Sequence, residues 1–148
     1  MDDVTLLAED GTAIGTLPKS EVHTHDTPLH LAFSCYVLDR EGRLLLTRRA
    51  LSKKTWPGVW TNSFCGHPRP DEAMSDAVRR HGAGELGLQL SEIRMLPPDY
   101  RYRAVDASGI VENEICPVHV AVFDGEPAAN PDEVSEWTWV AVGPLVEA

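Results

Sequence analysis

Residues 65–88 read CGHPRPDEAMSDAVRRHGAGELGL and contain the strongest helix signal in the chain. The range 71–86 follows Pro70, begins with acidic residues, spaces its small apolar residues helically and stops before Gly87. Proline before a helix and glycine after it are typical boundary residues. This segment therefore predicts a helix over 71–86.

The rest of the chain is dominated by predicted strands. Apolar and alternating runs between turn residues predict them at 4–8, 12–17, 29–38, 43–47, 59–64, 100–105, 111–123 and 136–142. The range 43–47 is the expected hairpin partner of 29–38, whereas 19–28 is polar and irregular. With no internal repeat and no long linker, the pattern predicts a mixed or antiparallel sheet with few helices, in the α+β or α/β class.

Size and charge limit the kind of protein. The chain has 148 residues, enough for one domain (1–148) with a hydrophobic core. Its net charge of −10 argues against nucleic acid or an anionic membrane as a main partner. No apolar run approaches the roughly 20 residues that span a bilayer. The start, Met1-Asp2-Asp3, lacks signal-peptide features, so we expect a cytoplasmic location.

The three cysteines differ in their surroundings. An odd number of cysteines without a leader argues against a disulfide framework. Cys35 and Cys116 lie in apolar strand segments and are expected to be buried. Cys65 lies among polar and small residues, which makes it the best candidate for a reactive thiol.

Two pairs of reactive residues share the same spacing. Cys65 and His67 are two residues apart, as are Glu112 and Glu114. Residues at i and i+2 of a strand point to the same face of a sheet. If both segments are strands, each pair presents two reactive groups to one side.

Three histidines and two carboxylates form a candidate metal-binding set. His23, His30 and His67 together with Glu112 and Glu114 suit a divalent transition metal such as Mn²⁺ or Zn²⁺. Each histidine alone is more commonly an ordinary surface or core residue. His25 and His119 remain alternative ligands at this level of argument.

A small basic cluster stands out in this acidic chain. Arg48, Arg49, Lys53 and Lys54 fall within seven positions. The cluster indicates either a site for a small anion or a solvated loop.

The helical segment matches part of a known motif. Gly66, Glu72, Arg80 and Glu85, with the Gly-Leu pair at 87–88, fit a frame that resembles the Nudix box, a loop-helix-loop that holds Mg²⁺ against a diphosphate. Hydrolytic boxes carry further carboxylates where this chain has His81 and Gly84. A Nudix hydrolase needs several carboxylates to bind metals and activate water, so the chain looks poorly equipped for hydrolysis.

Several segments together resemble one particular Nudix-fold family. They are HLAFS (30–34), LLTRRALSKK (45–54), WPGVWTNS (56–63), CGHP (65–68), YRA (102–104) and GIVENE (109–114). These segments are similar to the type 1 isopentenyl diphosphate isomerases, metal-dependent enzymes of isoprenoid biosynthesis that interconvert isopentenyl and dimethylallyl diphosphate. The resemblance implies a Nudix-like fold with a mixed central sheet, flanking helices and an added N-terminal hairpin.

The resemblance also implies a role for each matching residue. It implies that Mn²⁺ or Zn²⁺ is held by His23, His30, His67, Glu112 and Glu114, that Glu85 binds Mg²⁺, that Lys19, Arg49 and Lys53 bind the substrate diphosphate, and that Cys65, Glu114 and Tyr102 are catalytic. These roles suit the reaction, because moving an unactivated double bond needs an acid and a base on opposite faces of the hydrocarbon. In this scheme Glu114 can deliver a proton and the Cys65 thiolate can remove one, the direction staying open because the reaction is reversible, and Trp60 is a candidate for cation–π stabilisation.

Some features depart from that family. His81 stands where the family often has a second arginine, and Gly82 and Gly84 weaken the end of the predicted helix by about 1 kcal/mol each. The chain also stops at Ala148, earlier than family members usually do, so a missing C-terminal segment and reduced activity are expected. A Nudix-type diphosphohydrolase and a catalytically impaired domain that binds metal or diphosphate are therefore the alternatives. The sequence leaves the native metal and the oligomeric state open.

Overall fold

The computed structural model describes residues 3–53, 56–123 and 125–141, with the backbone alone for 97–100 and Tyr102. Its strands are β1 (Asp3–Leu7), β2 (Ala13–Pro18), β3 (His30–Leu31), β4 (Phe33–Leu38), β5 (Arg43–Arg49), β6 (Trp60–Thr61), β7 (Phe64–Gly66), β8 (Ser91–Val105), β9 (Val111–Val122) and β10 (Val134–Ala141). The helices in this part of the chain are α1 (Lys19–Val22) and α2 (Met74–Leu86).

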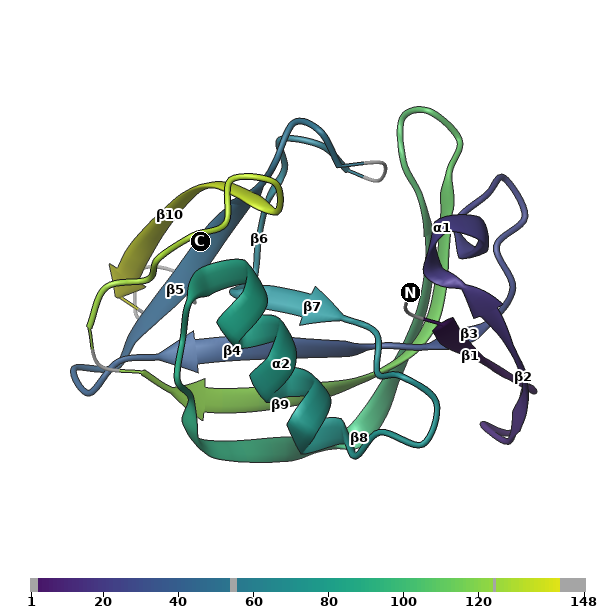
Figure 1. Ribbon diagram of the computed structural model, residues 1–148, viewed down its shortest axis with the longest axis horizontal. Coiled ribbons are helices and arrows are strands. Elements are labelled where there is room, and N and C mark those ends of the chain that lie inside the picture. The colour runs from purple at the N-terminus through teal and green to yellow at the C-terminus, as the bar shows by residue number, and fades with distance from the viewer. Residues whose placement is uncertain (1–2, 54–55, 124, 142–148) are drawn as a thin grey trace.

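The strands form one mixed sheet, and α2 crosses in front of its centre (Figure 1). The main path runs β10-β5-β4-β9-β3-β1-β2, while β6, β7 and β8 pair with β5, β4 and β9. Strand β9 runs parallel to both β3 and β4, and the other pairings are antiparallel. The predicted mixed sheet with few helices is confirmed.

The N-terminal hairpin is present, but a short helix follows it where the sequence predicted irregular chain. Strands β1 and β2 pair from Asp3↔Pro18 onward. The single turn of α1 then buries Val22 completely. A four-residue helix is too short to show helical periodicity, so no local pattern predicts it.

The predicted continuous strand over 29–38 is wrong, because Ala32 separates β3 from β4. The predicted hairpin of 29–38 with 43–47 is present, because a tight turn joins antiparallel β4 and β5, but their pairing is short. Strand β4 pairs with β5 at Leu38↔Leu44, and β5 otherwise runs along β10 and β6. Ser63 lies between the diverging strands: its Oγ accepts from Val37 N–H at 2.7 Å and donates to Leu45 O at 2.6 Å.

The predicted strand over 59–64 is likewise two strands, β6 and β7. Asn62 lies between them, and its side-chain amide donates to Cys35 O at 3.1 Å and to Phe64 O at 2.9 Å. These bonds let the chain leave β5 at Thr61 and join β4 at Phe64. Strand β7 thereby carries Cys65 to the centre of the sheet.

Helix α2 begins at Met74, three residues later than predicted. Asp71 has a positive φ of 64°, which is incompatible with a helical turn. The helix ends as predicted, because Gly87 has φ 62° and its N–H bonds to Ala83 O.

Gly82 is buried in the helix, where a Cβ would lie 2.9 Å from Leu90 Cδ1 and 3.3 Å from Phe64 Cζ. The absence of a side chain there lets α2 approach β7 closely.

Strand β8 is far longer than the predicted range 100–105. It pairs with β9 from Ser91↔Val122 to Val105↔Val111, with register shifts between Ser91 and Arg94 and between Leu96 and Tyr100. Two consecutive prolines, at 97 and 98, interrupt the strand pattern in the sequence. The β8–β9 hairpin curls toward the N-terminal elements (Figure 1), and this curvature carries the ends of β8 and β9 to the site described below.

The core lies between α2 and the sheet. It includes Phe33 and Leu45 from the sheet, Val78 and Leu86 from the helix, and Leu88 after it. In the part of the chain that the structure describes, no helix has the length and apolar character of a bilayer span.

Candidate active site and metal centre

A cavity of about 870 Å³ opens beside the sheet and gathers side chains from most of the molecule. Charged and polar residues line much of it: Lys19, Ser20, His23, Arg49, Ser52, Lys53, Thr61, Cys65, His67, His81, Glu85, Glu112, Glu114 and Glu133. Trp56, Val59 and Ala104 give it apolar surface. Both residues of each predicted pair, Cys65 with His67 and Glu112 with Glu114, therefore face the same cavity.

Four of the expected metal ligands converge in space. The donor atoms of His23, His30, His67 and Glu114 lie within 4.8 Å of one another. The ring centroids of the three histidines are 5.1–5.4 Å apart. The parallel pairing of β3 with β9 places His30 opposite Glu114. His23 follows α1, and His67 follows β7, so the cluster depends on both missed features, the α1 turn and the break before β7.

Glu114 is the centre of this cluster. Its Oε2 contacts His30 Nε2 at 3.2 Å and His67 Nε2 at 3.3 Å. His30 Nδ1 donates to Pro28 O at 2.9 Å, the arrangement in which Nε2 is left for a metal. The fifth expected ligand, Glu112, contacts His23 through Oε1 and Nε2.

Burial and the neighbouring charges shift the pKa values of these groups in different directions. Burial lowers the pKa of His67 to about 4. Burial and the charge of Glu114 raise the pKa of Glu112. Although burial alone would raise the pKa of Glu114, hydrogen bonds from His30 and His67 hold it well below its usual range. A neutral imidazole and an ionised carboxylate are the forms that bind metals.

The residues fit a divalent transition metal. Three imidazoles and the Glu114 carboxylate converge in one small, buried space, with Glu112 against His23, and this donor set suits Mn²⁺ or Zn²⁺. Among the described residues, buried His67 Nδ1 has no hydrogen-bond partner, so the ring is held mainly through its contact with Glu114. The two histidines left open as alternative ligands are not part of the cluster: His25 is exposed and bonds to Gly109 O, and His119 packs near Phe33.

Cys65 lies on β7 and lines the cavity beside the metal centre. Its thiol points toward Asn62 Oδ1 at 3.9 Å. Burial raises the pKa of the thiol, and the negative charges of Glu114 and Glu85 add to this effect. The sequence-based expectation of a Cys65 thiolate is therefore not what these surroundings favour, because they keep the proton on sulfur. Cys35 and Cys116 are buried, as predicted.

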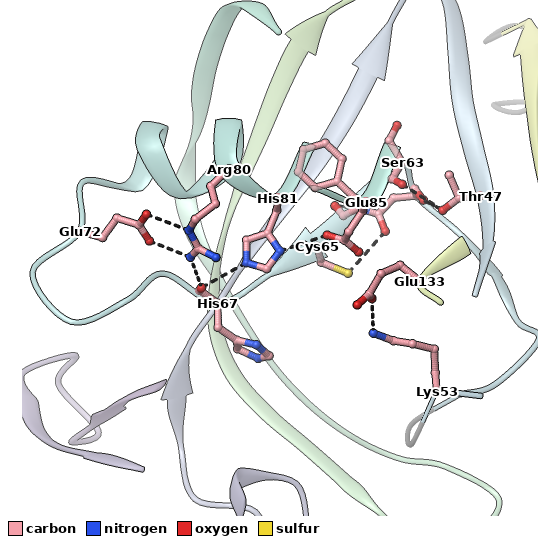
Figure 2. A network of polar contacts seen from close by, with 12 residues as sticks. Thr47, Lys53, Ser63, Cys65, His67, Glu72, Arg80, His81, Glu85 and Glu133 are labelled. Atoms are coloured by element: carbon pink, nitrogen blue, oxygen red, sulfur yellow. Dashed lines mark hydrogen bonds and ion pairs between the residues drawn. The ribbon is translucent and has the colours of Figure 1, made fainter. Parts of the chain in front are cut away.

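Helix α2 contributes the carboxylate that was expected to bind Mg²⁺. Glu85 lines the cavity and accepts a hydrogen bond from His81 at 3.1 Å (Figure 2). Arg80, the residue before His81, pairs with Glu72 at 2.8 Å and donates to the backbone carbonyl of His67. The part of the Nudix-like frame formed by Glu72, Arg80 and Glu85 is thus intact. The positions at which hydrolytic boxes carry further carboxylates are occupied here by His81 and by Gly84, which is exposed.

The expected diphosphate-binding cations, Lys19, Arg49 and Lys53, all line the same cavity. Of the basic cluster seen in the sequence, Arg49 and Lys53 line the cavity, whereas Arg48 bonds to Glu136 and to Gly58 O. Lys54 lies outside the described residues.

Two aromatic residues, Tyr102 and Trp60, were also expected to take part in the reaction. The backbone of Tyr102 pairs with Glu114 across β8 and β9, and its side chain lies outside the described part of the chain. Trp60, suggested for cation–π stabilisation, does not line the cavity, where Trp56 lies instead.

Two cavity residues, Glu133 and His81, received no role in the site predicted from the sequence. Glu133 pairs with Lys53 at 2.5 Å across 80 positions, and His81 contacts Glu85 (Figure 2). The spacing of His81 and Glu85, one helical turn apart, could have indicated their contact. No local signal connects Glu133 with Lys53, because the loop between β5 and β6 brings them together.

Comparisons with known proteins agree on the family. Residues 28–147 match the NUDIX domain family. The chain is 59% identical over 145 residues to the isopentenyl-diphosphate Delta-isomerase of Clavibacter michiganensis subsp. michiganensis, a match that covers 98% of this chain and 75% of that protein. It is 62% identical over 141 residues to the protein of the same name from Corynebacterium efficiens, covering 92% and 74% of the two chains.

Solved structures show the same fold at lower identity. The protein DR0079 of Deinococcus radiodurans matches with a TM-score of 0.75 and 20% identity, over 99% of this chain and 87% of that one. A MutT Nudix hydrolase from Burkholderia pseudomallei matches with a TM-score of 0.62 and 28% identity, over 78% and 84%. At 20% identity the first likeness speaks for the fold alone, whereas the matches near 60% reach the specific family. The chain therefore belongs to the isopentenyl-diphosphate Delta-isomerase family and has the Nudix fold.

Proposed function

We propose that this chain interconverts isopentenyl diphosphate and dimethylallyl diphosphate, a step of isoprenoid biosynthesis, by adding a proton to the alkene and removing another. The observation that carries the proposal is the single cavity that holds a histidine–carboxylate metal centre, a cysteine and three cationic side chains together. To isomerise a hydrocarbon diphosphate, a site needs positive charge for the diphosphate and both an acid and a base for the alkene. The cations supply the first, and Cys65 and the Glu114 carboxylate of the metal centre supply the acid and the base.

The cations anchor the substrate. Lys19, Arg49 and Lys53 bind the diphosphate at the rim of the cavity, where opposite charge and hydrogen-bond donors favour it. Glu85 holds the Mg²⁺ that accompanies the diphosphate. The apolar side chains of Trp56 and Val59 face the cavity and suit the hydrocarbon part of the substrate.

The metal centre is formed by His23, His30, His67, Glu112 and Glu114, which would hold Mn²⁺ or Zn²⁺. Bound there, the ion supplies positive charge that fixes the carboxylates and stabilises their ionised forms. The chain's own residues orient the centre: Pro28 O sets the ring of His30, and β9 presents both carboxylates on one face.

Cys65 and Glu114 exchange protons with the substrate. One group gives a proton to the terminal alkene carbon, whose π electrons form the new C–H bond and leave a tertiary carbocation. The other group takes a proton from the neighbouring CH₂, and that C–H electron pair becomes the new double bond. Tyr102, opposite Glu114 in the sheet, assists this carboxylate.

The pair must begin with one group protonated and the other ionised. The raised pKa of Cys65 and the lowered pKa of Glu114 support an assignment in which the thiol is the donor toward isopentenyl diphosphate. The sequence left the direction of transfer open and offered Glu114 as one possible donor; this assignment gives that role to Cys65 instead. In the reverse reaction the two roles are exchanged.

One assay tests the proposal against its alternatives. The protein is incubated with isopentenyl diphosphate, Mg²⁺ and Mn²⁺, and both dimethylallyl diphosphate and released phosphate are measured. Isomer without phosphate is the expected result. Phosphate release would instead identify a diphosphohydrolase, an outcome that the absence of carboxylates at His81 and Gly84 disfavours. Metal binding without either product would identify a catalytically impaired binding domain.

A further inference from the structure

His81 occupies a tightly defined place between α2 and β7. Its ring lies over Gly66, where an added Cβ would come within 2.6–2.7 Å of three ring atoms. It also packs edge-on against Phe33, with the ring centroids 5.3 Å apart. Gly66 therefore provides the space for the imidazole, and the packing fixes the plane of the ring.

Both ring nitrogens contact the active site. Nδ1 is 3.1 Å from Glu85 Oε2, and Nε2 is 3.4 Å from the carbonyl oxygen of His67. Figure 2 shows the imidazole between the Glu85 carboxylate and the backbone carbonyl of His67. His81 thus connects the expected Mg²⁺-binding carboxylate with the strand that supplies a ligand of the histidine–carboxylate centre.

The two contacts are not equally important. The carbonyl of His67 accepts a hydrogen bond from Arg80, which is itself held by Glu72 at 2.8 Å and 3.0 Å. The strand therefore has a second anchor. Within the described residues, by contrast, His81 is the sole hydrogen-bond partner of the Glu85 side chain. A glutamate side chain has three rotatable bonds. Holding its carboxylate in one orientation therefore costs conformational entropy, which a hydrogen-bond partner offsets.

We propose that His81 is a positioning residue that holds the Glu85 carboxylate toward the cavity and so sets the affinity for the divalent cation of the diphosphate. This inference rests on the proposed function, in which Glu85 binds that cation. The relevant contact is Nδ1–H to Oε2, and the contact to the backbone of His67 is secondary. Partners that orient metal ligands in this way typically change metal affinity by about 10- to 100-fold when they are removed.

Three variants separate the two contacts. Asparagine places an N–H donor near the position of Nδ1, and glutamine places one near the position of Nε2. Phenylalanine keeps the ring on Gly66 and Phe33 without either donor. His81→Asn should therefore retain the contact with Glu85, His81→Gln should retain only the contact with His67 O, and His81→Phe should lose both.

The measurement is binding of Mn²⁺ in the presence of inorganic diphosphate, followed by the electron paramagnetic resonance signal of free Mn²⁺. The histidine–carboxylate centre is first saturated with Zn²⁺, so that the signal reports the second cation. We expect His81→Phe and His81→Gln to weaken Mn²⁺ binding by about 10- to 100-fold, and His81→Asn to stay close to the unsubstituted protein. Ala83→Phe, at an exposed position of the same helix, controls for a new phenyl ring.

The outcomes distinguish this inference from the proposed function. Unchanged Mn²⁺ affinity in His81→Phe would overturn the positioning role, as would loss in His81→Asn with retention in His81→Gln. Glu85→Gln is the reference: if it also binds Mn²⁺ normally, the assignment of Glu85 itself is wrong, and the inference falls with it. Thermal melting of each variant shows whether a loss of affinity comes from unfolding, and His81→Asn then gives the rescue that a purely structural role would not show.

Discussion

At the residue scale, the roles of neighbouring side chains depend on which face of the chain each presents. Cys65 and His67 line one cavity, yet Gly66 between them faces α2 and leaves room for His81. A side chain at Gly66 would push this helix away from β7. The short motif therefore combines the proposed proton-transfer group, a proposed metal ligand and a helix contact in three consecutive residues.

Cys65→Ala should reduce isomerisation by about 10²- to 10⁴-fold, because it removes one member of the proton-transfer pair. The metal content should stay unchanged, since the thiol is not among the ligands. Both are measured on the same preparation, by product formation and by elemental analysis. Cys116→Ala is the matched control, as this buried cysteine does not line the cavity. Activity that survives in Cys65→Ala would remove the thiol from the mechanism.

His23→Ala should lower the occupancy of the histidine–carboxylate centre by roughly 10-fold or more at limiting metal, because one donor of a converging set is lost. His25→Ala offers a close control, since His25 is only two positions away, is exposed and bonds to Gly109 O instead. Metal content is measured after dialysis against a fixed low concentration of Zn²⁺. Equal occupancy in the two variants would exclude His23 from the ligand set.

At the element scale, the glycines of α2 have different consequences. Both were expected from the sequence to weaken the helix, but Gly82 is pressed against Leu90 and Phe64, whereas Gly84 has open space around its Cα. Gly82→Ala should destabilise the protein by about 1–3 kcal/mol through overpacking. Gly84→Ala should stabilise it by up to about 1 kcal/mol through higher helix propensity. Urea unfolding measures both, and a stabilising Gly82→Ala would contradict the close packing of α2 on β7.

The turn between β4 and β5 should make stability depend on acidic pH. Although burial opposes its ionisation, hydrogen bonds from Arg43 keep the pKa of Asp39 below its usual value. A carboxylate with a lowered folded-state pKa stabilises the fold above its unfolded pKa of about 3.9, and this contribution is lost as pH falls through the folded value. Asp39→Asn should therefore lower the melting temperature at pH 7, and the difference from the unsubstituted protein should shrink near pH 3. A constant difference at both pH values would show that Asp39 acts without its charge.

The sequence predicted the elements better than their pairing. Helix α2 and most strands were predicted because their apolar periodicity and boundary residues are local. The divergence of β4 and β5 was not, because it depends on Ser63 bonding to Val37 and Leu45 from a distant segment. The site residues were found through a family resemblance, whereas the pairing of Lys53 with Glu133 depends on tertiary structure alone.

At the scale of the whole molecule, the metal centre joins parts of the chain that are distant in sequence. His23 follows the N-terminal hairpin, His67 follows β7, and Glu114 lies on β9. The donor atoms meet only when the hairpin, the central sheet and the β8–β9 ribbon are assembled. A metal ion that binds this centre therefore binds the folded chain in preference to the unfolded one.

Metal removal should consequently reduce stability as well as activity. A ligand at 100 times its dissociation constant stabilises the folded state by about 2.7 kcal/mol, so adding Mn²⁺ or Zn²⁺ to protein treated with a chelator should raise the melting temperature. The increase should grow with metal concentration. His67→Ala should abolish most of it, because the ring contacts Glu114 at the centre of the cluster. An equal increase in His67→Ala would mean that the metal stabilises the protein from another site, and the histidines and carboxylates would then need a different role.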